Sequence, residues 1–313
     1  MTHLRAVSLM ILVTLLWSMA GVVTRLLDSA PSFEVTFWRS TFNALALAVA
    51  LTLLRGIGLW RRLLYSPRVI WFSGICWAIM FTAFMVAITL TTVANVLITL
   101  AVGPLVTALF AHLFLHHRLP PATWLAIAGA SLGIVWMFCQ DGGGGIALIG
   151  TLVALAVPLA GAANFTILQH VGMNRGKVIA AGEKQALDML PAVLIGATLS
   201  ALAMLPLSWP FQASTHDLCL LSYLGIFQLA LPCLLVVRLS RELPAPELIL
   251  LAQLEVVFGV TWAWLWAGEQ PSMNTLSGGL LVLGALVANE LVRIFHARTA
   301  KICQSRNLFR SSI

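Results

Sequence analysis

Glu255 is an acidic residue inside a long apolar stretch, about ten residues into the segment 246–267. If this segment is a membrane-crossing helix, a rise of 1.5 Å per residue puts the carboxyl group about 15 Å deep. Inserting an ionisable group at mid-bilayer costs roughly 2.5–3.5 kcal/mol on insertion scales. Such a residue is therefore expected either to pair with another group or to serve the function of the protein. Two interpretations stand: a cavity-lining acid that binds an amine or takes a proton, or a structural carboxyl that is neutral or paired with a neighbouring helix.

The residues that share a helical face with Glu255 are Gly259, Trp262 and Trp266. We expect the glycine to leave a gap beside the carboxyl group and the two indoles to form an aromatic wall. Glu255 and Trp262 are therefore assigned to a predicted substrate site.

Two glutamines lie near the middle of apolar segments, Gln228 in 218–237 and Gln253 in 246–267. Pro232 follows Gln228 by one turn and frees a backbone carbonyl, which predicts a local kink. The alternative is a hydrogen bond between helices, which contributes about 0.6–2 kcal/mol in membranes. Both glutamines are kept as substrate-binding candidates, with the structural interpretation left open.

Three further residues join the predicted substrate site because of their depth or position. Trp17 and Trp77 lie at mid-depth in their segments, where the interfacial preference of tryptophan does not apply. Each is expected to form a cavity wall or to pack between helices. Thr99 begins the segment 93–115 together with Asn95, near the expected outer face, where both residues could line a vestibule.

Arg39 lies eight residues after Pro31, and Asn43 follows one turn later on the same face. The guanidinium could anchor a substrate carboxylate, or it could tie its helix to another through backbone carbonyls or Glu34. We favour the structural role for it. A second set of residues is predicted to serve gating or structure, because its members are buried polar groups or mid-segment prolines: Arg39, Asn43, Asn95, Asn164, His112, Pro104 and Pro158.

The elements that carry these residues are apolar segments long enough to cross a membrane. The chain has 313 residues, 60% hydrophobic and only 9% charged, whereas a soluble domain carries about 25% charged residues. Such a composition excludes a soluble enzyme, a disordered protein and a nucleic-acid binder. It predicts an all-α polytopic membrane protein with ten transmembrane helices. The predicted spans are 6–26, 33–54, 69–89, 93–115, 122–139, 146–169, 186–205, 218–237, 246–267 and 273–293.

The basic residues predict the orientation of these spans. Of the 18 Lys and Arg residues, 16 fall in the two termini and the loops on the same side, while Arg25 lies on the opposite side and Arg39 inside a span. Basic residues accumulate on the cytoplasmic side of membrane proteins. We therefore expect both termini to be cytoplasmic and the protein to span the cytoplasmic (inner) membrane many times.

An internal repeat divides the chain in two. The segment from Ala94 resembles the segment from Ala245, 151 residues later. With a one-residue shift further along the alignment, His117 aligns with Glu269. Five spans per half force the second half to enter the membrane inverted, which is a common transporter plan. The predicted units are 1–143 and 144–295, two inverted five-helix repeats, followed by a basic cytoplasmic tail at 296–313.

Several short motifs, in their order and spacing, give the chain a family resemblance over about residues 6–292. They are Leu15-Leu16-Trp17-Ser18, the run from Phe37 to Phe42 around Arg39, Pro104, Leu254-Glu255-Val256-Val257 and Gly268-Glu269. Together they resemble the EamA-type, ten-span branch of the drug/metabolite transporter superfamily. The family often has Pro at the position of Val256, and Gly-Glu-Arg where this chain has His116-His117-Arg118.

The resemblance implies a secondary transporter that exports small organic metabolites, such as amino acids, by alternating access. It also implies that span two, with Arg39, lies at the periphery of the cavity. An uptake permease or a multidrug-type efflux carrier remains an alternative, since direction depends on gradients. A membrane-embedded enzyme or lipid-handling protein is less favoured, because no Walker A, H-E-x-x-H or G-x-S-x-G triad pattern occurs.

The expected partners are a small-molecule substrate and the lipid bilayer, with no nucleic acid, and a homodimer is left open. The five cysteines are scattered without metal-ligand spacing. We therefore predict neither a metal nor a cofactor, and no enzymatic activity.

Overall fold

The computed structural model describes residues 3–115, 120–140, 145–180, 189–239, 251–289 and 291–292. Within these residues, six helices are long and apolar enough to cross a membrane and four shorter helices are also apolar. Each of them overlaps one of the predicted spans, with ends that differ by up to a few residues, and the all-α polytopic membrane fold is confirmed. His117, the boundary between the two predicted repeats and the tail 296–313 lie outside the described residues.

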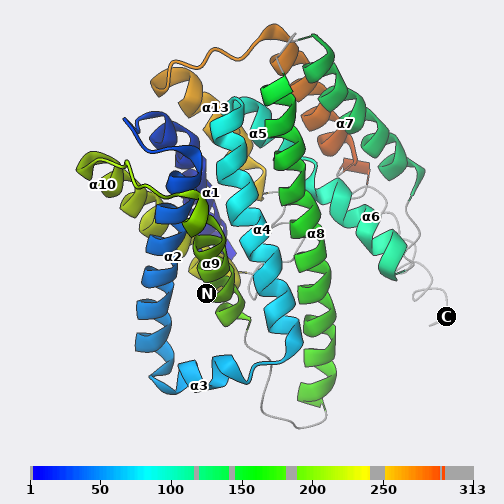
Figure 1. Cartoon of the computed structure of the whole chain (residues 1–313). Coiled ribbons are helices and arrows are strands. Elements are labelled where there is room, and N and C mark those ends of the chain that lie inside the picture. The colour runs from blue at the N-terminus through cyan, green and yellow to red at the C-terminus, as the bar shows by residue number, and fades with distance from the viewer. Residues whose placement is uncertain are drawn as a thin grey trace, which may run out of the picture.

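The helices follow one another along the chain with short connections (Figure 1). The first part contains α1 (His3–Arg25), α2 (Ser32–Arg55), α3 (Gly58–Leu64), α4 (Arg68–Leu90), α5 (Val93–Leu100), α6 (Gly103–Leu115) and α7 (Pro121–Gln140). The second part contains α8 (Gly145–Ala180), α9 (Leu190–Met204), the 3₁₀ turn η1 (Leu205–Leu207), α10 (Thr215–Tyr223), the π-helix η2 (Leu224–Ala230), α11 (Leu231–Leu239), α13 (Leu254–Trp266) and a last helix, Met273–Asn289.

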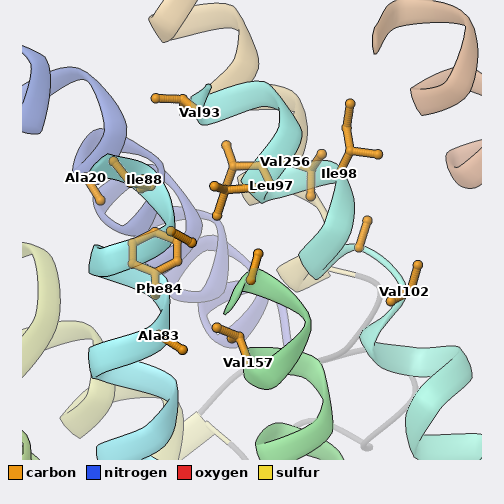
Figure 2. Packing of buried hydrophobic residues seen from close by; sticks show 14 of the residues in the cluster. Ala20, Ala83, Phe84, Ile88, Val93, Leu97, Ile98, Val102, Val157 and Val256 are labelled. Carbon is orange, nitrogen blue, oxygen red and sulfur yellow. The ribbon is translucent and has the colours of Figure 1, made fainter. Parts of the chain in front are cut away.

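Helices that are distant in sequence pack side by side in the bundle. Helix α4 packs against α8 and α9, α2 against α9 and η2, and α1 against α13. The end of α1, the α4–α5 connection and the chain after α13 lie at one end of the bundle, with α3 at the other (Figure 1). The main apolar cluster joins α5 to α1, α4, α8 and α13, as Figure 2 shows for Leu97, Ala20, Phe84, Val157 and Val256. Residues from both halves of the chain therefore share one core.

Glycines allow the closest helix contacts, because they bring two backbones together in a membrane. A Cβ added at Gly225 of η2 would lie 2.6 Å from Cβ of Phe42 and 2.8 Å from the carbonyl oxygen of Arg39. Helix η2 thus touches α2 at the turn that carries Arg39. Similarly, a Cβ at Gly196 of α9 would overlap Cβ of Trp77 in α4.

The connection between spans three and four contains no Gly or Pro and is made by a helix cap. The Thr92 side chain accepts a hydrogen bond of 3.2 Å from the amide of Asn95 in the first turn of α5. Span four itself is broken at Ala101 and Val102, and Pro104 lies in the first turn of the helix that follows. Pro158, in contrast, lies inside the continuous helix α8.

Candidate functional site

Arg39 lies in the interior of the bundle, with only 1% of its surface exposed. Its Nε and Nη2 atoms donate to Oε1 of Gln228, at 3.3 and 2.9 Å. Its Cζ lies 5.6 Å from the ring centroid of Phe84, and Nε2 of Gln228 donates to the carbonyl of Trp17 at 3.1 Å. The guanidinium of α2 is therefore held by groups from α1, α4 and η2.

These contacts decide between the structural partners expected for Arg39. Glu34 is not its partner, because the Glu34 carboxylate accepts hydrogen bonds from the amides of Gln212 and Ala213 and from Trp38 Nε1. Glu34 thus holds the segment before α10. Arg39 is among the largest fully buried side chains of the described residues.

The position of Gln228 follows from local sequence. Pro232 has no amide hydrogen and cannot donate to the carbonyl of Gln228 four residues earlier. The chain here is a π-helix, Leu224–Ala230, whose pairing runs over five residues. Short π-segments inside α-helices are frequent at functional sites. The predicted kink after Gln228 therefore takes the form of a π-helix.

Four buried polar atoms have no hydrogen-bond partner among the described residues: Nη1 of Arg39, Nδ2 and Oδ1 of Asn43, and Oε1 of Gln253. Buried polar groups are paired in about 90% or more of cases, because an unpaired group has lost its hydration without replacement. Three of the four atoms belong to residues one turn apart on α2. The folded chain therefore leaves a concentrated set of unused donors and acceptors in an apolar bundle.

Glu255 lies on α13 and is partly buried. It interacts electrostatically with Arg39, yet it makes no hydrogen bond or ion pair with any described residue. An intramembrane carboxylate normally pairs with a nearby cation or a backbone group. The interior of the bundle thus holds one basic side chain on α2, Arg39, and one acidic side chain on α13, Glu255.

The aromatic residues that follow Glu255 differ in part from the sequence interpretation. Trp262 donates from Nε1 to Oγ of Ser18 at 3.1 Å, and its ring stacks on Trp266 with centroids 4.7 Å apart. Gly259 does not leave the expected gap, because an added Cβ would overlap Cδ1 of Leu97. The glycine lets α13 approach α5. The sequence of α13 alone does not show that Leu97 of α5 fills the space beside it.

Other predicted residues lie in helix–helix contacts. Thr99 is fully buried and donates to the carbonyl of Asn95 at 2.7 Å, while Oδ1 of Asn95 accepts from Thr275 at 3.1 Å. Asn95 thus helps to fasten α5 to the last helix, while the hydrogen bond of Thr99 stays within α5. Trp77 packs on Phe81 of its own helix, with ring centroids 5.3 Å apart, and lies against Gly196 of α9.

Two gating candidates lie further along the chain. Asn164 accepts a 2.6 Å hydrogen bond from Ser73, which joins α8 to α4. The ring of His112 meets Trp124 edge-on, with centroids 5.7 Å apart. Neither Asn164 nor Ser73 contacts Arg39 or Glu255, so the structure does not bring all predicted residues into one site.

Sequence reasoning missed an ion pair at the end of the bundle where α1 ends. Nε of Arg25 lies 2.6 Å from Oε1 of Glu269, and its Nη2 donates to the carbonyl of Thr91 at 2.8 Å. Oε2 of Glu269 accepts from the amide of Val93 at 3.0 Å. The pair joins α1, the α4–α5 connection and the chain after α13. The isolated position of Arg25 on its side of the membrane was the available signal.

A cluster of polar side chains at the same end of the bundle joins the α1–α2 loop to the start of α10. Ligand-type atoms of Asp28, His216 and Asp217 lie within 4.8 Å of one another. The Asp217 carboxylate already accepts four hydrogen bonds, from the amides of Asp28, Ser29 and Ser214 and from Oγ of Ser29. This acid therefore fastens the α1–α2 loop to the start of α10.

The fold and its polar interior define a multi-pass helical membrane protein of the transporter class. The model of the EamA-like transporter family matches the chain twice, at residues 4–139 and 148–289. The chain therefore belongs to the EamA-like transporter family.

Similar proteins agree with this membership. The pseudopaline exporter CntI of Pseudomonas aeruginosa (strain UCBPP-PA14) is 25% identical over 283 residues, covering 86% of this chain and 90% of that protein. The uncharacterized transporter PA0485 of P. aeruginosa is 29% identical over 130 residues, or 41% of this chain and 44% of that one. A solved crystal structure at 21% identity covers 92% of this chain and 98% of its own, with a TM-score of 0.61, and shows the same fold.

Proposed function

We propose that this transporter is a secondary carrier that exports small organic metabolites, such as amino acids, by alternating access. The observation that carries the proposal is the set of buried polar atoms without a hydrogen-bond partner among the described residues, on Arg39, Asn43 and Gln253, together with the partly buried carboxyl group of Glu255. Such groups are costly in a membrane and mark substrate pathways. The direction of transport is inferred from the related pseudopaline exporter.

The proposed architecture is two inverted five-helix repeats, residues 1–143 and 144–295, with both termini and the tail 296–313 in the cytoplasm. Two separate matches to the family model and the five spans in each half support it. Carriers of this plan bind substrate near the midplane between the repeats. Arg39 and Asn43 come from the first proposed repeat, and Gln228 and Glu255 from the second.

In this orientation the Arg25–Glu269 pair lies on the external side. It joins three segments there, and Val93 beside it is 0% exposed. We propose that the pair holds the external end closed while the site is open to the cytoplasm, and that it separates when the site opens outward. Alternating access requires such a contact to form and break in each cycle.

The test is a metabolite-release assay in cells that overexpress the wild-type chain or Glu255→Gln. The substitution keeps the side-chain volume, so we expect normal membrane insertion and at least tenfold less release of the exported metabolites. A fully active, stable Gln variant would remove Glu255 from the site. Metabolites that accumulate inside expressing cells, rather than in the medium, would identify an uptake permease instead.

A further inference from the structure

We propose that α3 and the turns on either side of it, residues 55–68, form a binding surface for anionic phospholipids. The arginines of this surface take the phosphate headgroups, and its exposed apolar side chains reach the acyl chains. In the proposed topology the segment lies at the cytoplasmic leaflet, which carries a negative surface potential. The inference concerns the lipid rather than the substrate, so it does not depend on the proposed export function.

The first argument is the placement of α3. The helix has seven residues, so at 1.5 Å per residue it is about 10 Å long and cannot cross a membrane. It runs across the end of the bundle, between the ends of α2 and α4 (Figure 1). Gly56, with a φ of 75°, allows the chain to turn out of α2, and Leu59 is buried in a core cluster with Leu51 of α2. The segment is therefore held against the bundle where its two neighbouring helices leave the membrane.

The second argument is the apolar surface that the protein leaves uncovered here. Ile57, Leu64 and Tyr65 are 81%, 74% and 82% exposed, and Trp60 is 41% exposed. The Trp60 indole donates from Nε1 to Oγ1 of Thr52 at 3.2 Å, so its ring is held at the end of α2. Aromatic and apolar side chains in such a position are favoured at the membrane interface, where headgroups meet acyl chains. Phospholipid is the occupant that fits this surface.

The third argument is the charge of the surface. Arg55, Arg61 and Arg68 are exposed, and Arg62 belongs to the same segment. The sequence has no Asp or Glu from residue 35 to residue 140, so the segment brings no acidic residue of its own. Neither Arg61 nor Arg68 forms an ion pair with a described residue. Each basic residue near an anionic membrane strengthens binding about fivefold, so these charges select anionic headgroups over zwitterionic ones.

The test uses variants that change the charge of the surface and leave its apolar side chains in place. Arg61→Gln combined with Arg68→Gln removes two charges, and Arg61→Lys combined with Arg68→Lys keeps both. The matched control is Arg5→Gln combined with Arg238→Gln, because these two arginines are also exposed and lie on α1 and α11 rather than on α3. The control changes the net charge of the chain by the same amount as the double Gln variant.

The measurement is native mass spectrometry of the purified full chain in detergent, with added phosphatidylglycerol or phosphatidylcholine of the same acyl chains. The wild type should bind phosphatidylglycerol about tenfold or more tightly than phosphatidylcholine. The double Gln variant should bind phosphatidylglycerol roughly 25-fold more weakly than the wild type, because two charges are lost at about fivefold each. The double Lys variant and the control should stay within about threefold of the wild type, since the charge of the surface is kept in both.

A second measurement tests whether the apolar side chains reach the acyl chains. Leu64→Cys, introduced after replacement of the five native cysteines, is labelled with a fluorophore in vesicles of phosphatidylcholine and phosphatidylglycerol. Lipid with a nitroxide on its acyl chain should quench the label more strongly than iodide present on both sides of the membrane, because the side chain at this position is expected to lie among the acyl chains.

Equal binding of the two lipids by the wild type overturns the proposal. An equal loss of binding in the double Gln variant and in the control also overturns it, because net charge alone would then explain the effect. Quenching of the label by iodide and not by the nitroxide lipid contradicts the placement of the surface in the bilayer. A second copy of the chain in the mass spectrum, lost in the double Gln variant, would assign the surface to a dimer instead. None of these results depends on whether the chain releases a metabolite, so failure of the lipid surface and failure of the export function are distinguishable.

Discussion

Replacing Glu269 with Gln tests whether the Arg25–Glu269 pair closes the external end. The two side chains are 29% and 16% exposed, and an exposed ion pair alone contributes about 0–1 kcal/mol. The contacts with Thr91 and Val93 add charge-assisted hydrogen bonds, of roughly 1.5–3 kcal/mol each before compensation. Gln keeps an acceptor and loses the charge. We therefore expect the closed state to lose about 1–2 kcal/mol, a 5–30-fold change in the ratio of states.

The assay is the rate of labelling of Val93→Cys by a membrane-impermeant maleimide added outside intact cells. All five native cysteines are first replaced, so that Val93→Cys is the single thiol. Val93 is 0% exposed and lies directly at the pair, so a thiol there reacts only when the external end opens. Glu269→Gln should raise the labelling rate about 5–30-fold, in line with the shift in the ratio of states.

The matched control is Asp28→Asn, which removes the exposed pair between Asp28 and His216 at the same end. It should leave the labelling rate of Val93→Cys unchanged. Equal rates for Glu269→Gln and the parent protein would refute the closing role of the pair. A similar increase in Asp28→Asn would point to general loosening of the loops and would refute it too.

Three further predictions follow from the structure. Glu255→Gln should lower metabolite release at least tenfold, equivalent to about 1.4 kcal/mol, without lowering the melting temperature; a destabilised but active variant would assign Glu255 to folding. Gly225→Ala should destabilise the protein by about 1–3 kcal/mol, because its Cβ would lie 2.6 Å from Cβ of Phe42, and thermal unfolding in detergent checks this. Reporter fusions should read cytoplasmic after Arg62 and external at Gln212, and one clear reversal would break the proposed topology.

The spans were predictable because their length and hydropathy are set by the bilayer itself. Even the connection before α5 was placed correctly without Gly or Pro, and the structure shows that Thr92 caps the helix there. Pro104, one of the prolines singled out, likewise lies in the first turn after the break in span four. These are local features, which a single sequence contains.

The site was predictable only in part, because the sequence of one helix does not show which residues of another helix it contacts. Arg39 and Gln228 were both singled out, yet their hydrogen bonds join residues 189 positions apart. The gap expected at Gly259 was wrong for the same reason, since Leu97 fills it from α5. The ion pair of Arg25 and Glu269 joins residues 244 positions apart, and the isolated position of Arg25 does not identify its partner.

The most direct test of the central claim is release of metabolites from proteoliposomes that contain the purified chain. Vesicles are loaded with a cell metabolite extract, diluted into buffer without ATP, and the released compounds are identified by mass spectrometry. We expect rapid release of a small set of organic metabolites, such as amino acids, from wild-type vesicles, and release at least tenfold lower from Glu255→Gln vesicles. Release from wild-type vesicles that matches protein-free vesicles for every compound would contradict it.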